Sequence, residues 1–227
     1  MKELLVIEKP NSNFSEEIKK TRTNLKFSRI HDDEKVIMIT SSLPGEGKSF
    51  VAANLAASFA QYNQKVLLID CDLRKGRQRK IFEIAEDKEK GLSNLLIDKD
   101  WQVNYPAYIK KTKVSKLLII PTGPFPPNPS ELLASDRFKE LIKELKNKFD
   151  VIILDCPPVV GLNDALVVSS IADMSIIVAK YKSTSIDLLE ESKKSLEAVN
   201  AKIAGVILNQ MEGIKSSYYY YGGYYKE

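Results

Sequence analysis

Apolar residues along this chain fall into short runs that are rich in branched side chains and end at turn residues. The runs occupy residues 36–40, 66–69, 117–120, 151–154, 175–178 and 203–208. Uninterrupted runs of this length are typical of strands buried on both faces of a sheet. Helical patterns at 49–62, 130–149, 165–171 and 185–199 separate most of them. This alternation predicts an α/β fold with a mostly parallel sheet and helices on both faces.

The N-terminal region carries a further helical pattern. The first dozen residues read as irregular chain. Asn13 is predicted to cap a helix over residues 14–28, with Glu16 three positions later closing a capping box. At helical spacing, one face of this helix then presents Phe14, Ile18, Thr21 and Leu25.

Two connecting stretches have their own character. Trp101 is predicted to lie in a polar loop, where it anchors local packing with Tyr105 and Tyr108. Residues 121–129 are rich in proline and read as a stiff surface loop rather than a linker, because strong patterns continue on both sides. A break at Ser135 and Asp136 would divide the helical pattern that follows.

A glycine-containing loop directly follows the first predicted strand and opens a helix. It reads Ser42-Leu43-Pro44-Gly45-Glu46-Gly47-Lys48-Ser49. Strand, GKS and helix together are the context of a P-loop, although Ser42 replaces the first glycine of the general pattern. The glycines let the backbone approach a phosphate at a helix N-terminus. Lys48 can then bridge the outer phosphates, and the Ser49 hydroxyl can ligate Mg²⁺. The alternative is an ordinary glycine-rich turn.

Three aspartates lie at the ends of predicted strands. Asp70 ends the run 66–69, Asp72 follows two residues later, and Asp155 ends the run 151–154. Residues two apart in extended chain share a face, so Asp70 and Asp72 can point at one site. Strand-end aspartates hold Mg²⁺ in P-loop proteins, and a remaining carboxylate can orient or deprotonate an attacking hydroxyl. The alternative is that each aspartate only caps the following turn.

Composition excludes several classes of protein. The chain has 227 residues and a formal net charge of +4, which is too mild for a nucleic-acid binder. Its two cysteines, Cys71 and Cys156, argue against a disulfide scaffold and fit core positions in a reducing cytosol. A single histidine excludes a histidine-based metal site. We expect neither a signal peptide nor a transmembrane helix, because no long apolar window is present.

The tyrosines are unevenly distributed. Six of the 10 lie in the last ten residues, at Tyr218, Tyr219, Tyr220, Tyr221, Tyr224 and Tyr225. Residues 215–227 contain no aliphatic side chain, so they read as a disordered tail after one domain that spans 1–214. The tail could be low-complexity filler, a stacking surface for single-stranded nucleic acid, or a phosphoacceptor array. Its few basic residues count against stacking.

These motifs together resemble the bacterial tyrosine kinases of capsule and exopolysaccharide synthesis, in particular the separate cytoplasmic kinase subunit of Gram-positive bacteria. The resemblance covers nearly the whole chain. It includes the P-loop, the motif 67–74 with its paired aspartates, the motif 152–158, the proline-rich segment 123–133, residues 205–209 and the tyrosine tail.

The resemblance implies Mg²⁺- and ATP-dependent autophosphorylation of the tail tyrosines in trans within a ring-like oligomer. It assigns Lys48 to the phosphates, Ser49, Asp72 and Asp155 to the metal, and Asp70 to accepting the tyrosine proton. Nucleotide contacts are expected from Pro44, Gly45, Glu46, Gly47, Lys48, Ser49, Phe50, Arg74 and Asn209, the last near the adenine.

The resemblance also implies partners. The family's oligomerisation helix carries Glu-x-x-Arg-x-x-Arg, which corresponds to Glu16, Lys19 and Arg22 here. Lys19 departs from that pattern, and lysine lacks the bidentate fork of arginine. Alternatively, these charges are only the solvated face of the helix. The expected partners are further copies of the chain, a transmembrane activator and a cognate tyrosine phosphatase. The expected location is therefore cytoplasmic, at the inner face of the membrane.

Single positions in the sequence argue against two other nucleotide-dependent functions. A MinD/ParA-type ATPase typically has a lysine where Leu43 stands, so this alternative is weakened. A GTPase would carry Asn-Lys-x-Asp after a late strand, but residues 209–212 read Asn-Gln-Met-Glu. A binding module without enzymatic activity does not need a P-loop followed by three strand-end carboxylates.

Overall fold

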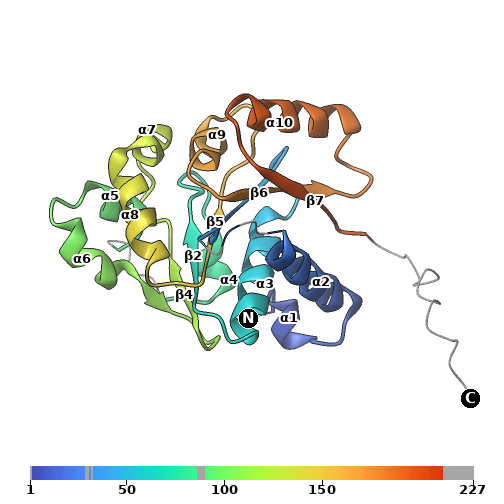
Figure 1. Cartoon of the computed structure of the whole chain (residues 1–227), viewed down its shortest axis with the longest axis horizontal. Helices are drawn as coiled ribbons and strands as arrows, with labels where there is room; N and C mark the ends of the chain where they lie inside the picture. The colour runs from blue at the N-terminus through green and yellow to red at the C-terminus, as the bar shows by residue number, and fades with distance from the viewer. Residues whose placement is uncertain (1, 29–30, 32, 86–89, 212–227) are drawn as a thin grey trace, which may run out of the picture.

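The computed structural model describes residues 2–28, 31, 33–85 and 90–211. Within these residues, seven strands form one sheet in the order β3-β4-β2-β5-β1-β6-β7 (Figure 1). Their bounds are β1 Val36–Ser41, β2 Val66–Asp70, β3 Lys110–Lys111, β4 Leu117–Ile120, β5 Val151–Asp155, β6 Met174–Lys180 and β7 Ile203–Asn209. The described pairings are parallel except that of β3 with β4, so the six strands expected from the sequence and their parallel sheet are confirmed.

Helices cover both faces of the sheet, as predicted. Alternate residues of β1 explain the division, because Ile37 and Ile39 join one buried cluster while Val36 and Met38 join the other. The first cluster contains residues of α1 Leu5–Glu8, α2 Asn13–Phe27, α3 Lys48–Gln61 and α4 Gln78–Ile81. The second contains residues of α5 Leu92–Ile97, α6 Trp101–Tyr108, α7 Pro129–Ala134, α8 Asp136–Lys146, α9 Asp164–Ser169 and α10 Ile186–Ala198.

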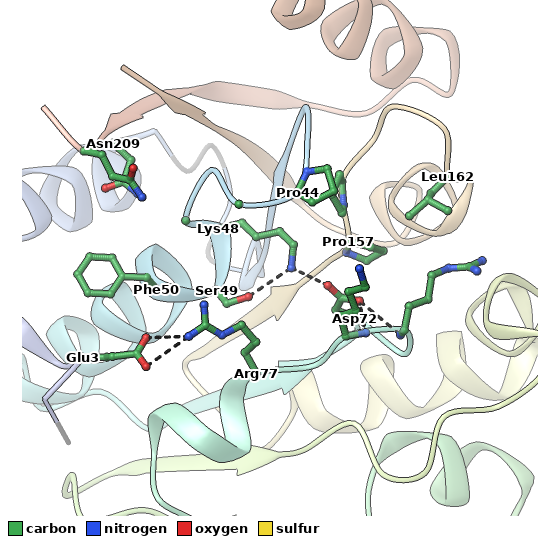
Figure 2. A pocket seen from close by; sticks show the side chains of 16 residues that line it. Glu3, Pro44, Lys48, Ser49, Phe50, Asp72, Arg77, Pro157, Leu162 and Asn209 are labelled. Carbon is green, nitrogen blue, oxygen red and sulfur yellow. Dashed lines mark hydrogen bonds and ion pairs between the residues drawn. The ribbon is translucent and has the colours of Figure 1, made fainter. Parts of the chain in front are cut away.

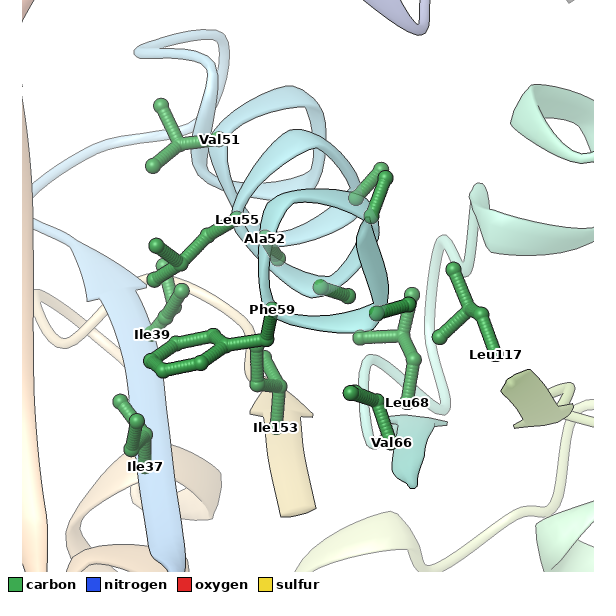
Figure 3. Packing of buried hydrophobic residues seen from close by; sticks show 14 of the residues in the cluster. Ile37, Ile39, Val51, Ala52, Leu55, Phe59, Val66, Leu68, Leu117 and Ile153 are labelled. Carbon is green, nitrogen blue, oxygen red and sulfur yellow. The ribbon is translucent and has the colours of Figure 1, made fainter. Parts of the chain in front are cut away.

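Helix α3 is the central element of the first face. Figure 3 shows Leu55 and Phe59 directed at Ile37, Ile39 and Ile153 of the sheet. Almost every residue of α3 from Lys48 to Ala60 is buried. A helix that is apolar on all sides needs cover on its outer side as well. Helices α1 and α2 provide that cover, and this rigid surrounding holds the N-terminus of α3 in place.

The N-terminal segment is ordered rather than irregular, which corrects the prediction for the first dozen residues. Leu4 and Val6 are fully buried, and residues 5–8 form α1. The buried Asn54 of α3 holds this segment: its Oδ1 accepts from the backbone N–H of Val6 at 3.0 Å, and its Nδ2 donates to the carbonyl of Glu3 at 2.9 Å. The segment has no periodic pattern of apolar residues. Its position is instead fixed by hydrogen bonds with one polar side chain that is distant in the sequence.

Local details of other elements also differ from the prediction. Ser12, not Asn13, caps α2, because its hydroxyl accepts from the backbone N–H of Ser15. Ser and Asn are similarly good caps, so sequence alone does not separate the two neighbours. Trp101 and Tyr105 are buried packing anchors as predicted, but they lie one turn apart on α6 rather than in a loop. The predicted break at Ser135 is confirmed, since Ser135 lies between α7 and α8.

Candidate active site

The predicted functional residues meet at the carboxyl edge of three neighbouring strands. β5 lies between β1 and β2, with Asp155 paired in register with Ile39 on one side and Asp70 on the other. The loop that follows β1 leads into α3, so the P-loop and the aspartates share one edge of the sheet. Ligands of open parallel sheets bind at this edge, in the crevice beyond the strand ends.

Two glycines give the loop its shape. Gly45 has φ +85° and Gly47 has φ +95°, in the left-handed region that favours glycine. A Cβ at Gly47 would come within 2.0 Å of Asn209 Nδ2, so space as well as backbone conformation requires glycine there. The loop turns into the N-terminus of the 14-residue helix α3, whose free N–H groups suit a phosphate.

Side chains from distant segments hold the loop in this shape. Glu46 is 4% exposed, and its carboxylate accepts from the backbone N–H of Leu43 at 2.9 Å and from the Thr184 hydroxyl. Asn209 donates through Nδ2 to the carbonyl of Glu46 at 2.9 Å. Asn209 therefore both lines the pocket and holds the P-loop. Glu46 is itself a residue of the loop, and its buried side chain stabilises the loop's shape. Thr184 carries no motif that sequence reasoning could have found.

Lys48 lies among the carboxylates. Its Nζ is 2.8 Å from Asp72 Oδ2 and 3.3 Å from the Ser49 hydroxyl (Figure 2). The same Nζ is 3.5 Å from Asp155 Oδ1. Burial opposes the charged form of Lys48, but Asp155 and then Asp72 outweigh it and raise the pKa of Lys48 above its usual range. The ammonium group is therefore the fixed positive charge of the site.

Asp70 lies behind this cluster. It is 1% exposed, and its oxygens accept from the backbone N–H groups of Asp72 at 3.3 Å and Gln78 at 2.9 Å. Burial, followed by repulsion from Asp155, raises the pKa of Asp70 to about 7. Gln78 also donates through Nε2 to Asp155 Oδ2 at 2.8 Å, so it positions two of the three carboxylates. Sequence analysis did not single out Gln78.

The donor set fits Mg²⁺ only together with phosphate. Among the described residues, no group of three or more His, Cys, Asp or Glu side chains is placed to hold a metal. Within the same part of the chain, Asp155 Oδ1 is buried and accepts no hydrogen bond. A carboxylate oxygen engaged by the 3.5 Å ion pair with Lys48, at a strand end beside the P-loop, suits an ion that keeps several waters and takes its other ligands from phosphates.

Arg74 has a partner that the sequence did not reveal. Its Nε and Nη2 donate to the two carboxylate oxygens of Asp164, at 2.8 and 3.1 Å. Asp164 is fully buried at the start of α9, and the Ser130 hydroxyl of α7 also donates to it. The bidentate pair connects the loop after Asp72 to α7 and α9, which lie on the other face of the sheet from α3. Ninety positions separate the partners, so no local pattern indicates the pair.

These residues surround a pocket of about 510 Å³. All of the predicted nucleotide contacts except Glu46 line it, and Figure 2 shows Lys48 at its centre. Asp72 lines the pocket, whereas Asp70 and Asp155 are not among its lining residues. A cleft of this size with a phosphate loop, a buried lysine and clustered carboxylates is equipped for phosphoryl transfer.

Comparisons with known proteins agree with this geometry. Residues 34–211 match a family model described as an AAA domain. The chain is 39% identical to CapB of Staphylococcus aureus over 97% of its length and 95% of that protein. It is 37% identical to YwqD, a tyrosine-protein kinase of Bacillus subtilis, over 96% of its length and 91% of that protein. This chain belongs to the bacterial tyrosine-protein kinase family.

Solved structures of related proteins show which fold this member of the tyrosine-kinase family has. The kinase domain of Escherichia coli tyrosine kinase ETK superimposes with a TM-score of 0.87 at 34% identity, covering 97% of this chain and 84% of that one. The chimerical protein CapA2B2 gives 0.86 at 36% identity, covering 93% and 91%. The cell-division ATPase MinD of Pyrococcus furiosus gives 0.66 at 26%, covering 79% and 73%. The predicted P-loop NTPase fold is confirmed.

The helix that the family resemblance assigns to oligomer contacts is α2. Lys19 Nζ lies 2.8 Å from Glu16 Oε1 and 2.9 Å from the carbonyl of Pro10. Arg22 donates to the Ser58 carbonyl at 3.1 Å, and its guanidinium lies 4.5 Å from the centre of the Tyr62 ring. Within one chain of this kinase family member, the three predicted contact residues thus make internal contacts.

Three further predictions concern other parts of this kinase family member. The six tail tyrosines and the whole segment 215–227 lie outside the described residues. Cys71 and Cys156 are both buried and free, as expected for core positions. Among the described residues, none of the helices is long and apolar enough to cross a membrane.

Proposed function

We propose that this chain is a Mg²⁺- and ATP-dependent tyrosine autokinase that phosphorylates its own tail tyrosines, from Tyr218 to Tyr225, in trans. The observation that carries the proposal is the contact of Lys48 with Asp72 and Asp155 beside a phosphate loop, in a chain whose relatives are named tyrosine-protein kinases. A P-loop alone would serve any ATPase, so family membership supplies the tyrosine acceptor.

The residues divide the work by position. Lys48 and the loop N–H groups bind and orient the phosphates. Ser49, Asp72 and Asp155 would hold Mg²⁺, which when bound neutralises charge on the phosphates. Asp70 is the proposed acceptor of the phenol proton, because a carboxylate whose pKa is raised to about 7 is matched to a base at neutral pH. Asp70 does not line the pocket, so this transfer requires a bridging water. The phenol oxygen bonds to the terminal phosphorus of ATP as the bond to the bridging oxygen of ADP breaks.

The product gives a physical route to regulation. Each phosphotyrosine carries about −1.5 to −2 charges, so several in one short tail repel one another. This repulsion would loosen an oligomer held through Glu16, Lys19 and Arg22. We assign the chain to control of capsular or extracellular polysaccharide synthesis and export, docked on a transmembrane activator at the inner membrane face and reversed by a tyrosine phosphatase. The likeness to the solved CapA2B2, a chimerical protein that is 36% identical to this chain, supports this assignment.

The test is phosphate mapping. Purified chain at high concentration is incubated with Mg-ATP, and modified residues are located by mass spectrometry. Label is expected on the tail tyrosines and should be lost in Lys48→Met but kept in Lys113→Met, a control at an exposed ion pair. For transfer in trans, a Lys48→Met chain should acquire label from a chain whose six tail tyrosines are replaced by phenylalanine.

A MinD/ParA-type ATPase is the alternative, and the structural likeness to MinD favours keeping it. Such an ATPase hydrolyses ATP and changes its assembly without modifying tyrosine. ATP hydrolysis with no phosphotyrosine on any chain would therefore refute the kinase proposal and support this one. Leu43 stands at the position where this ATPase class carries a lysine, and this counts against the alternative.

A further inference from the structure

The position of Lys48 in the P-loop divides the pocket into two ends. Figure 2 shows Phe50 and Asn209 on one side of Lys48, and Pro157 and Leu162 on the other. A P-loop lysine reaches the outer phosphates of a nucleotide. Because Lys48 Nζ is directed at Asp72, the outer phosphates belong on the Asp72 side. A group that attacks the terminal phosphate in line must enter from the end where Pro157 and Leu162 lie.

An apolar wall lines this outer end. Pro157, Pro158 and Leu162 all line the pocket. The wall is held to the end of β1, since the Thr40 hydroxyl donates to the Pro157 carbonyl at 2.6 Å and the backbone N–H of Val159 donates to the Ser41 carbonyl at 2.8 Å. Pro157 and Pro158 belong to the motif 152–158, but Leu162 lies outside both this motif and the P-loop, so the motifs do not account for the whole wall.

A turn presents Leu162 to the pocket. Gly161 has φ +79°, and the backbone N–H of Leu162 donates to the Val159 carbonyl at 3.4 Å. Two residues later, the buried Asp164 pairs with Arg74. This pair connects the turn that carries Leu162 to the loop that carries Asp72. The apolar wall and the carboxylate that faces the phosphates are therefore positioned together before any ligand binds.

We propose that Pro157, Pro158 and Leu162 form the subsite for the side-chain ring of the tyrosine acceptor. The subsite rests on the proposed kinase function and deepens it by naming how the acceptor is chosen. A flat ring packs against proline and leucine, while its hydroxyl extends toward the cluster at Asp72. Asp72 is 5% exposed, so it lies deep in the pocket, and a serine or threonine hydroxyl on its much shorter side chain would reach less far toward it from the same wall. Arg74 and Asp164 are positioning residues for this subsite.

The test separates acceptor binding from nucleotide binding. The probe is a synthetic peptide with the sequence of residues 215–227, added to the full-length chain with Mg-ATP. Leu162→Asp should raise the KM for the peptide about tenfold or more, since one apolar contact in a pocket is worth roughly that factor. The KM for ATP should stay within about twofold. Leu162→Met should raise the KM for the peptide much less than Leu162→Asp does, because it keeps the wall apolar. Ile97→Ala, on the exposed end of α5, is the control for an unrelated apolar surface residue.

Binding is measured in parallel so that the two proposals fail separately. Fluorescence anisotropy of the labelled peptide, in the presence of Mg²⁺ and a non-hydrolysable ATP analogue, should show weakened binding to Leu162→Asp. Unchanged peptide binding and unchanged peptide KM in Leu162→Asp would overturn the subsite, as would an equal rise in the KM for ATP. A wild-type chain that binds the peptide without phosphorylating it would instead overturn the kinase function and leave the subsite standing.

Discussion

Lys48 and Asp72 form an ion pair with Nζ and Oδ2 2.8 Å apart, and both side chains are about nine-tenths buried. Asp155 and Asp70 lie in the same interior, and the charge of Lys48 interacts with all three carboxylates. Lys48 therefore compensates part of the charge of three carboxylates at once. In the protein without metal, the fold depends on a lysine that the reaction also needs.

Lys48→Met should destabilise the metal-free chain strongly. Removing one partner of a buried pair leaves uncompensated charge, which typically costs about 3 kcal/mol or more. Urea unfolding at pH 8 in the presence of a chelator measures the loss. Lys113→Met, which breaks an ion pair between exposed side chains, should change the free energy of unfolding by less than about 1 kcal/mol. Equal losses in the two variants would contradict the role of Lys48 as the compensating charge.

Stability of the metal-free chain should fall as pH rises toward 8, through Asp70. Its pKa is about 7 in the folded chain and 3.8 without its surroundings, so the folded state binds more protons than the unfolded state between these values. The free energy of unfolding then decreases with rising pH, by about 2 kcal/mol between pH 5.5 and 8. Urea titrations in chelator give the slope.

Asp70→Asn is the matched variant for this titration. It cannot lose a proton, so its free energy of unfolding should depend on pH less steeply than that of the wild type. Subtracting the two curves cancels all other groups that titrate in the same way in both proteins. Parallel curves from pH 5.5 to 8 would show that Asp70 is not protonated in the folded chain.

Thr184→Val should weaken nucleotide binding without touching the pocket. The Thr184 hydroxyl donates to the buried Glu46 and accepts from the backbone N–H of Lys180 at 2.8 Å. Valine removes the hydrogen bonds to Glu46 Oε1 and from the Lys180 N–H, at a cost of about 1–3 kcal/mol, while Glu46 keeps its bond from the Leu43 N–H. Because Glu46 shapes the P-loop, calorimetry should show a Kd for ATP that is raised several-fold. Thr23→Val, at an exposed position, is the control. An unchanged Kd would mean that the loop keeps its shape without Thr184.

The sheet could be predicted because it is written in local patterns. Five of the six long strands are runs of mostly buried residues, whereas β7 alternates between partly buried and exposed positions. The carboxyl ends of β1, β2 and β5 lead directly into the P-loop and the aspartates. β3 escaped prediction because two lysines at an edge have no apolar pattern. Helix α6 escaped because Pro106 lies within its eight residues and interrupts the helical signal.

The residues of the site also divide into those that sequence predicts and those that it does not. Lys48, Ser49, Asp70, Asp72 and Asp155 are found from sequence because the chemistry needs those residue types at strand ends. Their supports could not be found, because each comes from a distant part of the chain. Thr184 reaches the loop across 138 positions and Asp164 reaches Arg74 across 90. A hydrogen bond between such residues has no spacing that a pattern could show.

Glu16→Ala combined with Arg22→Ala should shrink the oligomer. In one chain, Arg22 is already engaged with the Ser58 carbonyl and the Tyr62 ring, so an oligomer contact requires it to face a neighbour as well. Its planar group has five donors and can serve both sides. Light scattering at matched protein concentration should show a lower mass for the double variant. A matched pair on α8, Arg137→Ala with Glu140→Ala, removes another arginine that donates to its own chain, at Leu96, and should leave the mass unchanged. If Arg22 serves only its own chain, the α2 variant will lose thermal stability while keeping the wild-type mass, and α2 will have no place in the interface.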